Sequence, residues 1–355
     1  MKKEPLRFGL IGYGKVARLH AIALRAADGA RLVAVAGRNK QRRDLFAAEF
    51  SIVSRDSAEA MVQKDGVDAV IITTPHPNHR DAAIEAFAAG CHVLVEKPMA
   101  LTTAQCDEMI EAGKRAGRLL SVVSQRRWYP SCSRIKKAIN EGKLGKPALA
   151  QVTILGWRDE AYYRSDSWRG SWEAEGGGVL INQAPHQLDL LCWYMGSVAE
   201  VKGFWDNINH PYIEVEDSAV AAVRFKNGGM ASLLLSNSQR PGIYAKVHIH
   251  GDSGSSAGVQ TDGGAMFVAG QSGILEPPVN DLWTIPGEEG NLDVWEKEDT
   301  AFFKSIEPTT WFFGRQIEDF ADAVANDRPP AVTGEEGRET VRLIEAVYHS
   351  DPKKR

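Results

Sequence analysis

The sequence is poor in cysteine and has no long hydrophobic run. It has 4 cysteines in 355 residues, scattered without CxxC or Cys/His spacing. We therefore expect no disulfide framework and no metal site, and we expect the cysteines to be small buried side chains. No run approaches the roughly 18 apolar residues of a membrane span, and Glu4 and Pro5 follow the basic start where a signal peptide would be apolar. The sequence predicts a cytoplasmic protein without a membrane partner.

The sequence also lacks an excess of charge of either sign. Lys+Arg 42 against Asp+Glu 46 gives a net charge of 42 − 46 = −4, which makes nucleic acid a poor candidate partner. Hydrophobic residues make up 43% and charged residues 25% of the chain, as in ordinary globular proteins. At about 150 residues per domain, this length predicts two domains.

Up to about Val123 the chain alternates short apolar runs with amphipathic helical patterns, which is typical of repeated βαβ units. Parallel strands need such helical crossovers, so the pattern predicts an α/β domain over residues 1–125 with a doubly wound parallel sheet, the Rossmann fold. The expected strands are Arg7–Ile11, Leu32–Ala36, Ala69–Thr73, His92–Val95 and Leu119–Val123. The expected helices are Ala17–Ala27, Arg42–Phe50, Arg80–Ala89 and Thr103–Ala116.

Residues 126–355 show a different pattern. After a helix at Cys132–Asn140, alternating segments follow one another, which predicts an α+β domain built on a large, mostly antiparallel open sheet. Gly228-Gly229 is typical of a hairpin turn. Residues 251–290 are rich in Gly, Ser, Pro and Asp and predict long loops. The expected strands are Ala148–Leu155, Glu200–Trp205, Ser218–Phe225, Gly229–Ser236 and Tyr244–Gly251, and the closing helices are about Gly314–Asn326 and Gly334–His349.

A glycine-rich loop follows the first expected strand and opens the first expected helix. It reads Gly12-Tyr13-Gly14-Lys15-Val16-Ala17, the G-x-G-x-x-[G/A] fingerprint. The first glycine allows a tight turn, the second lets backbone approach a pyrophosphate, and the alanine permits close helix–strand packing. The helix N-terminus offers N–H groups and a positive dipole end to the phosphates. The loop therefore predicts a dinucleotide site.

The end of the second expected strand bears on the choice between NAD and NADP. NAD enzymes usually carry an acidic residue there for the ribose hydroxyls, but this chain has Gly37 followed by Arg38, Lys40 and Arg42. Gly37 removes the group that would repel a 2′-phosphate, and the basic residues could neutralise one. NADP is slightly favoured over NAD, and the alternative is an ordinary solvated turn.

Two further stretches stand out. Glu96-Lys97-Pro98 comes just after a buried strand, preceded by Thr73-Thr74-Pro75-His76-Pro77-Asn78-His79, and residues 176–189 read GGGVLINQAPHQLD. With these motifs in this order, the sequence resembles the Gfo/Idh/MocA oxidoreductases, the family of glucose–fructose oxidoreductase and inositol dehydrogenase. The resemblance covers essentially the whole chain.

The resemblance implies reversible hydride transfer between a nicotinamide and a sugar or cyclitol alcohol. It gives Lys97 a place beside the nicotinamide and the reacting hydroxyl, and it gives His186 the exchange of the hydroxyl proton. It also implies a cis peptide bond before Pro98, and homo-dimers or homo-tetramers joined through the C-terminal sheet. The positions it assigns to the cofactor cleft, besides the glycine-rich loop, are Thr74, Pro75, His79, Glu96 and Lys97.

Chemistry gives these two side chains the same roles. Oxidising an alcohol requires a base for the O–H proton while the hydride leaves. Histidine has a suitable pKa, whereas lysine needs burial or a neighbouring positive charge to lower its pKa. The alternatives are a surface lysine paired with Glu96 and a core histidine.

One departure from the family pattern D-x-G-x-H-x-x-D bears on the substrate. Asn182 and Ala184 stand where Asp and Gly are usual, and because asparagine cannot act as an anion, a carboxylate–His dyad is excluded there. Asn182-Gln183 looks like relatives that oxidise pyranosides at C3. Asn182 would then bond a substrate hydroxyl, and Asp189 is a candidate structural residue.

A segment between Trp157 and Trp172 mixes five aromatic residues with arginines and aspartates. It fits no helical or strand period, so we expect a loop, and carbohydrate sites need this mixture of flat apolar faces and charged groups. The alternative is an aromatic plug between domains. Relatives also place an arginine after the last Rossmann strand, where this chain has Arg127. The candidate substrate contacts are Arg127, Trp157, Arg158, Trp168, Asn182 and His186.

The sequence thus favours an NAD(P)-dependent dehydrogenase or reductase that acts on the ring alcohol of a carbohydrate. Alternatives of the same chemistry are an inositol or cyclitol dehydrogenase and an enzyme that cleaves glycosides through transient 3-oxidation. A non-catalytic NADP-binding regulator is a third possibility, which the presence of Lys97 and His186 disfavours.

Overall fold

The computed structural model describes residues 4–263 and 276–351, and the chain divides into two compact units. The first unit comprises the chain up to Gln125 together with Thr309–Arg338. The second comprises Arg126–Pro308 together with the residues from Glu339 onward. Residues 309–338 were expected in the second domain, and this expectation is corrected because their apolar side chains complete the core of the first unit.

The first unit is built on a six-stranded parallel sheet of order β3-β2-β1-β4-β5-β6. This is the Rossmann order, so the expected α/β fold is confirmed. Strand β3 was not predicted, since a three-residue strand leaves almost no periodic signal. Helix α3 was not predicted either. The strands are β1 (Leu6–Ile11), β2 (Ala30–Ala36), β3 (Val53–Arg55), β4 (Ala69–Ile72), β5 (His92–Val95) and β6 (Leu120–Val122). The helices are α1 (Lys15–Ala26), α2 (Lys40–Phe50), α3 (Ala58–Asp65), α4 (His79–Ala88), α5 (Thr103–Ala116) and most of α11 (Pro308–Ala325).

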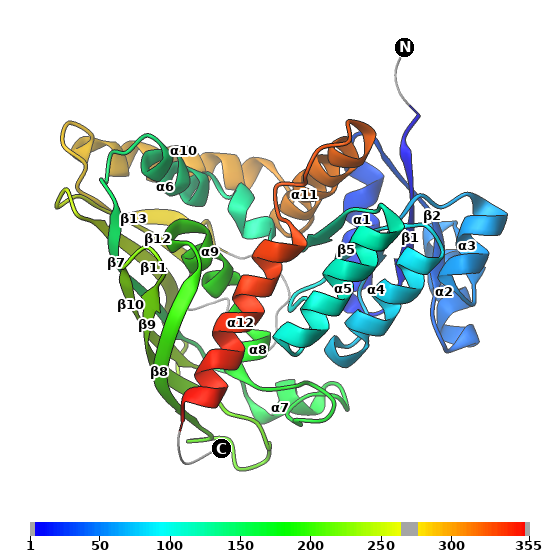
Figure 1. The fold of residues 1–355 in the computed structure, drawn as a ribbon, viewed down its shortest axis with the longest axis horizontal. Coiled ribbons are helices and arrows are strands. Elements are labelled where there is room, and N and C mark those ends of the chain that lie inside the picture. The colour runs from blue at the N-terminus through cyan, green and yellow to red at the C-terminus, as the bar shows by residue number, and fades with distance from the viewer. Residues whose placement is uncertain (1–3, 264–275, 352–355) are drawn as a thin grey trace. The chain divides into compact units, whose positions relative to one another are not determined.

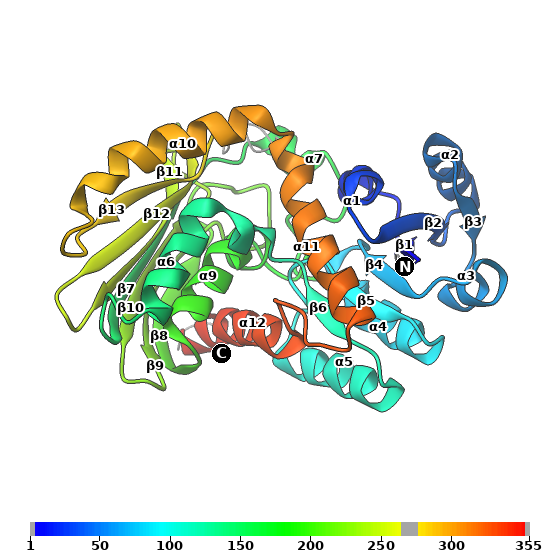
Figure 2. The same ribbon diagram turned by 90° about the horizontal axis from the view of Figure 1, so that it is seen from above.

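The core on one face of this sheet is closed by helices from both ends of the chain. Phe8 and Leu10 of β1 are fully buried, together with side chains from α1 and α2. Ile317 and Phe320 of α11 are buried in the same cluster, and Figure 2 shows α1 and α11 on the face of the sheet away from α4 and α5. Helix α11, some 300 residues from β1 in the sequence, therefore covers the face of the sheet that β1 presents to α1.

The second unit contains a seven-stranded sheet of order β13-β12-β11-β7-β10-β9-β8. All neighbouring strands are antiparallel except β7 and β10, which confirms the expected, mostly antiparallel sheet. The strands are β7 (Pro147–Leu155), β8 (Val198–Asp206), β9 (Ser218–Phe225), β10 (Met230–Ser236), β11 (Tyr244–Gly251), β12 (Ser256–Gly263) and β13 (Val279–Trp283). The helices are α6 (Pro130–Asn140), α7 (Glu160–Arg164), α8 (Val179–Asn182), α9 (Pro185–Met195), α10 (Leu292–Ser305) and the later part of α12 (Gly334–Ser350).

Two expectations about loops have different outcomes. The hairpin turn is confirmed, because Gly228, with a φ of 90°, lies in the connection between β9 and β10. The expectation of long loops over residues 251–290 is wrong in part, because β12 and β13 extend the sheet there. Residues 264–275 of this stretch lie outside the described residues. Ser and Gly are weak strand formers, but their backbone groups pair along β11 all the same.

The two faces of the second sheet differ. Helices α6 and α9 lie along one face (Figure 1). On the other, several large apolar side chains are exposed, among them Phe204 of β8 at 65% and Val220 of β9 at 53%. An exposed apolar face of this kind is typical of a surface that meets a partner.

Candidate functional site

The glycine-rich loop of the first unit could hold a pyrophosphate. Gly12 has a φ of 116°, and a Cβ there would lie 2.6 Å from Thr73 Oγ1 and 2.9 Å from the Thr73 carbonyl group. Gly14 is the N-cap of α1, and a Cβ on it would meet no described atom within 4 Å. Ala17 is fully buried against the sheet, while Lys15 and Val16 are exposed. The first turn of α1 also has no acidic residue, so a phosphate can approach its N–H groups.

The turn after β2 carries basic side chains. Arg38 is exposed, and no carboxylate occurs from Gly37 to Asn39. The Tyr13 ring covers Gly37, since a Cβ at Gly37 would lie 2.3 Å from Tyr13 Cε1, and the Tyr13 hydroxyl accepts a 3.0 Å hydrogen bond from the Asn39 N–H. Arg43 donates to the Gly37 carbonyl oxygen at 2.8 Å, and this hydrogen bond helps to fix the turn.

A buried histidine joins the segments that follow β4 and β5. His79 is fully buried, with Nδ1 2.8 Å from the Pro98 carbonyl oxygen and Nε2 2.9 Å from the Thr74 carbonyl oxygen. Burial lowers the pKa of His79, while the two carbonyl oxygens favour its protonated form. Pro75 is exposed beside it. His79 therefore links the two segments that carry Thr74, Pro75 and Lys97.

Glu96 is the carboxylate of a buried pair. Its Oε1 lies 2.7 Å from His20 Nε2, and its Oε2 accepts a 3.1 Å hydrogen bond from the Lys97 backbone N–H. Burial opposes ionisation of Glu96, but the His20 hydrogen bond and the Lys97 charge outweigh it and hold its pKa below the usual value. Lys97 itself is partly buried, and the expected cis peptide bond to Pro98 is present. The backbone of Lys97 is thus fixed by its neighbour's carboxylate.

Asn182 and His186 lie in the second unit, on two consecutive helices. Asn182 is the last residue of α8, and His186 is in the first turn of α9. Asn182 Nδ2 donates to Tyr162 Oη at 3.2 Å and to Glu175 Oε1. Lys97 belongs to the first unit, so the two proposed proton carriers lie in different units.

The start of α8 is held by a buried carboxylate. Glu216 accepts hydrogen bonds from the N–H groups of Gly178 at 2.8 Å and Leu180 at 2.9 Å, and from the Tyr348 hydroxyl at 2.9 Å. A Cβ on Gly178 would lie 1.7 Å from the Glu216 carbonyl oxygen, so only glycine fits there. These three donors lower the pKa of Glu216, but burial outweighs them and raises it to about 7.

The free energy of unfolding is expected to fall as pH rises from about 4.5 to about 7. Because the folded pKa of Glu216 is raised above its usual value of 4.5, the folded protein binds the proton more tightly. This contribution is therefore complete below about pH 4.5 and is lost as pH rises through about 7. The shift corresponds to roughly 3 kcal/mol. Urea unfolding across this range tests it, with Glu216→Gln as the variant that cannot ionise. An equally steep fall in that variant would exclude Glu216 as the source.

The aromatic segment 157–172 contains a short helix, so the expectation of a continuous loop is wrong in part. Helix α7 begins after Asp159, whose carboxylate caps the Tyr162 N–H at 2.8 Å. Arg158 is buried and its guanidinium lies 5.1 Å from the Tyr162 ring. The Trp157 ring lies 5.4 Å from the ring of buried His210 and is tilted by 37° to it, and the Arg169 guanidinium lies 4.4 Å from the Trp168 ring. A single turn of helix is too short to show a period.

Sequence reasoning missed the polar cluster that this segment forms with α8. Arg169 Nη1 donates to Tyr162 Oη at 2.5 Å, and Gln183 Nε2 donates to the same oxygen at 3.1 Å. Buried Glu175 accepts from the Gly170 N–H at 2.5 Å. Tyr162 and Arg169 were visible as members of an aromatic and charged segment, but their meeting with residues 182–183 depends on the fold.

Arg127 has a different environment from the one expected. Its Nε and Nη2 donate to the two carboxylate oxygens of Asp189 at 2.9 and 2.7 Å, and both side chains are buried. The guanidinium also lies 5.1 Å from the Trp193 ring. This bidentate pair engages Arg127 within the protein, so we leave it out of the proposed substrate contacts.

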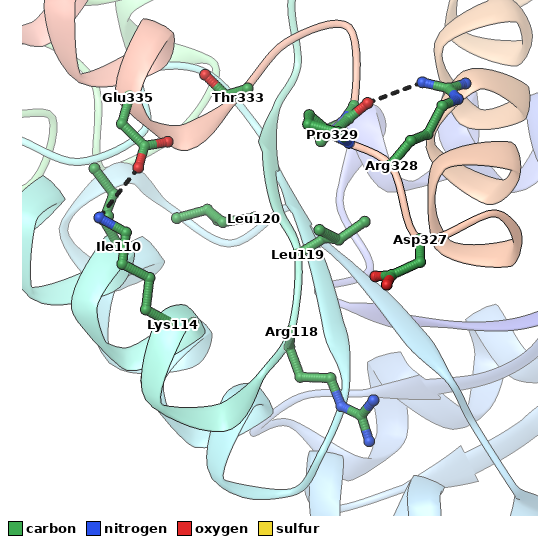
Figure 3. A pocket seen from close by; sticks show the side chains of 12 residues that line it. Ile110, Lys114, Arg118, Leu119, Leu120, Asp327, Arg328, Pro329, Thr333 and Glu335 are labelled. Carbon is green, nitrogen blue, oxygen red and sulfur yellow. Dashed lines mark hydrogen bonds and ion pairs between the residues drawn. The ribbon is translucent and has the colours of Figure 1, made fainter.

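A pocket of about 350 Å³ lies elsewhere in the first unit, between α5, the start of β6 and the segment after α11 (Figure 3). Leu119 and Leu120 line it beside charged side chains, among them Lys114 and Glu335, which pair at 3.3 Å. It lies at the amino end of β6, whereas the nucleotide loop follows the carboxyl end of β1. In a parallel sheet these ends are on opposite edges, so this pocket is separate from the nucleotide loop.

None of the helices in the described residues has the length and apolar character needed to cross a membrane. Among residues 4–263 and 276–351 there is no group of three or more His, Cys, Asp or Glu side chains placed to hold a metal ion. All four cysteines are buried, as expected.

The sequence matches two family models in chain order. Residues 6–124 match the oxidoreductase family with an NAD-binding Rossmann fold, and residues 132–257 match the Gfo/Idh/MocA C-terminal domain. The chain belongs to the Gfo/Idh/MocA oxidoreductases. It is therefore an enzyme that uses a nicotinamide dinucleotide, as its sequence motifs predicted.

Similar proteins include two enzymes and one solved structure. The myo-inositol 2-dehydrogenase of Thermotoga maritima is 27% identical, over 99% of this chain and 97% of that protein. The D-glucoside 3-dehydrogenase of Escherichia coli is 28% identical over 65% of this chain and 70% of that protein. The WlbA dehydrogenase of Bordetella pertussis, solved with NADH and UDP-GlcNAcA, is 28% identical with a TM-score of 0.85, covering 99% of this chain and 96% of that chain.

Proposed function

We propose that this enzyme transfers a hydride between a nicotinamide and a ring secondary alcohol of a sugar or glycoside, at C3. The observation that carries the proposal is Asn182, whose amide is oriented by Glu175 and Tyr162. An amide can bond a sugar hydroxyl without taking its proton. The similarity to a D-glucoside 3-dehydrogenase and to an enzyme solved with a nucleotide sugar supports the same substrate class.

Lys97 and His186 handle the hydroxyl proton in this proposal. Alcohol oxidation needs a group that accepts the O–H proton while the C–H hydride leaves to the bound nicotinamide. Glu96 fixes the backbone of Lys97 through its N–H, and the first turn of α9 carries His186. The sugar ring is positioned in this proposal by Asn182, Trp157, Arg158 and Trp168. Holding the reacting carbinol in a fixed place supplies a large part of the rate enhancement.

We also propose that NADP is preferred over NAD. The cofactor supplies the hydride acceptor, and Gly12, Gly14 and the N–H groups of α1 would hold its pyrophosphate. Arg38 is exposed beside Gly37, with no carboxylate in that turn to repel a 2′-phosphate. Thr74, Pro75 and His79 would line the nicotinamide end, in keeping with their place after β4.

Arg38→Ala is expected to weaken NADP binding about tenfold and to leave NAD binding nearly unchanged, because a charge-assisted contact to phosphate is lost. Dissociation constants for both cofactors measure this, and Arg31→Ala at the exposed start of β2 is the matched control. Gly37→Asp is a poorer probe, since its Cβ would collide with the Tyr13 ring. A parent enzyme that binds NAD tenfold more tightly than NADP would refute the preference.

A homo-dimer or homo-tetramer joined through the second sheet completes the proposal. Phe204 and Val220 are more than half exposed on its outward face, and covering such side chains on association is favourable. Sedimentation velocity measures the oligomeric state of the parent and of Phe204→Glu. We expect the variant to associate less, since a charge on this face would disfavour association.

The substrate assignment is tested with a panel of glucosides, free sugars, sugar phosphates and inositols, following NAD(P)H absorbance and locating the product carbonyl by NMR. A 3-keto pyranoside is the expected product. Turnover of inositols alone would favour the cyclitol alternative, and glycoside cleavage without net NAD(P)H production would favour transient 3-oxidation. Turnover of acyclic alcohols alone would refute a ring substrate.

A further inference from the structure

Three side-chain donors meet at the phenol oxygen of Tyr162: the Arg169 guanidinium and the amides of Asn182 and Gln183. Guanidinium and amide N–H groups only donate, so the phenol oxygen is the acceptor in all three contacts. A phenol oxygen has two lone pairs, and three donors occupy them fully. Tyr162 therefore has no acceptor capacity left for a ligand.

The orientation of both amides is fixed by other partners. Asn182 Nδ2 also donates to Glu175 Oε1, which as a carboxylate can only accept. Gln183 Oε1 accepts a 2.8 Å hydrogen bond from Asn237 Nδ2, which leaves its NH2 group facing Tyr162. Exchanging O and N in either amide would break these contacts, so the direction of the hydrogen bonds to Tyr162 follows from the network.

The proton of Tyr162 remains to be placed. Burial raises the pKa of the phenol, against the nearby charges of Arg169 and Arg158, so the hydroxyl is protonated at neutral pH. In residues 4–263 and 276–351, every contact recorded for this hydroxyl brings a donor to it and none an acceptor. Buried or half-buried hydroxyl donors normally find an acceptor, and this one has none among the described residues.

We propose that Tyr162 is a specificity-determining residue whose phenol donates a hydrogen bond to an acceptor oxygen of the substrate. This proposal rests on the proposed function, in which Asn182 contacts a hydroxyl of the same sugar. Donation from Arg169 to the phenol oxygen polarises the O–H and strengthens it as a donor. Tyr162 and Asn182 then contact two oxygens of one ring, which selects the carbinol that is presented for oxidation.

Tyr162→Phe removes the hydroxyl and keeps the ring that packs against Arg158 and Arg169. We expect this variant to bind the substrate about tenfold more weakly, with KM raised more than kcat is lowered. Tyr163→Phe is the matched control, since Tyr163 is on the same helix with its ring 5.1 Å from Tyr162, and it should change binding by less than about twofold. Calorimetric titration of the NADPH-loaded enzyme with methyl β-D-glucopyranoside, D-glucose and myo-inositol measures this, and thermal unfolding checks the fold.

A second variant separates substrate contact from a purely structural role. Replacing Tyr162 by 3,5-difluorotyrosine lowers the phenol pKa with little change in shape. If Tyr162 donates to the substrate, binding is lost as pH rises through that lowered pKa, because a phenolate cannot donate. If Tyr162 only accepts from Arg169, Asn182 and Gln183, ionisation strengthens these contacts and binding persists, which would overturn the proposal.

The titration also distinguishes the two proposals. Binding that depends on Tyr162, without hydride transfer from any sugar to the oxidised nicotinamide, supports the Tyr162 proposal and refutes the dehydrogenase assignment. Sugar oxidation with equal substrate binding by the parent and by Tyr162→Phe supports the dehydrogenase assignment and refutes the Tyr162 proposal. A parent protein that binds none of the probes overturns both.

Discussion

Lys97→Ala and His186→Ala are each expected to lower kcat by about 10²-fold or more, the usual scale of proton-transfer catalysis. The reaction needs a group that takes the hydroxyl proton as the hydride leaves, and alanine cannot supply one. Cofactor binding should survive, because in our proposal the glycine-rich loop and the N-terminus of α1 hold the pyrophosphate. Steady-state kinetics and cofactor titration of the same preparations measure both quantities.

Lys97→Arg separates proton transfer from charge. Arginine keeps the positive charge but does not give up its proton at any working pH, so this variant should be nearly as slow as Lys97→Ala. Lys64→Ala, at an exposed position of α3, controls for the loss of a lysine. Full activity in both alanine variants would refute the assignment of Lys97 and His186.

Arg127→Met is expected to lower the free energy of unfolding by about 3–5 kcal/mol, as when one partner of a buried ion pair is removed. The change leaves the Asp189 carboxylate buried, with 5% of its side chain exposed and its bidentate partner gone. KM of the folded fraction should change little, since Arg127 is engaged with Asp189. Urea unfolding and kinetics of the same variant measure both effects.

The double variant Arg127→Met/Asp189→Leu is the informative control. With both charges replaced by apolar side chains, much of the lost stability should return. Arg118→Met, at an exposed arginine, should change stability by less than about 0.5 kcal/mol. A stable Arg127→Met enzyme with a KM raised tenfold would restore Arg127 to the substrate site.

The fold was predictable where local patterns and global packing agree. Helix α5 was predicted with its observed bounds because Thr102 caps its start and Gly117 adopts a left-handed conformation at its end. Strand β9 shows strict alternation of buried and exposed residues. Strand β12 was missed because Ser256 and its small neighbours have low strand propensity, and only pairing with β11 and β13 makes them a strand.

The site was predictable only as far as each motif is contiguous. The loop from Gly12 to Ala17 is a single segment, so its conformation could be expected from its residues. The cluster at Tyr162 joins residues about 20 positions apart, and no local pattern predicts that they meet. Arg127 was given a substrate role by analogy, while its pairing with Asp189, 62 positions away, depends on how α9 packs.

The return of Thr309–Arg338 to the first unit also determines the order in which a growing chain can fold. At roughly 5–20 residues per second, the ribosome adds the roughly 180 residues between Gln125 and Thr309 in roughly 10–40 s. Throughout this time Phe8 and Leu10 lack the cover of Ile317 and Phe320. The nascent Rossmann sheet therefore presents an apolar face to chaperones and to other nascent chains until the segment with Ile317 and Phe320 has left the ribosome.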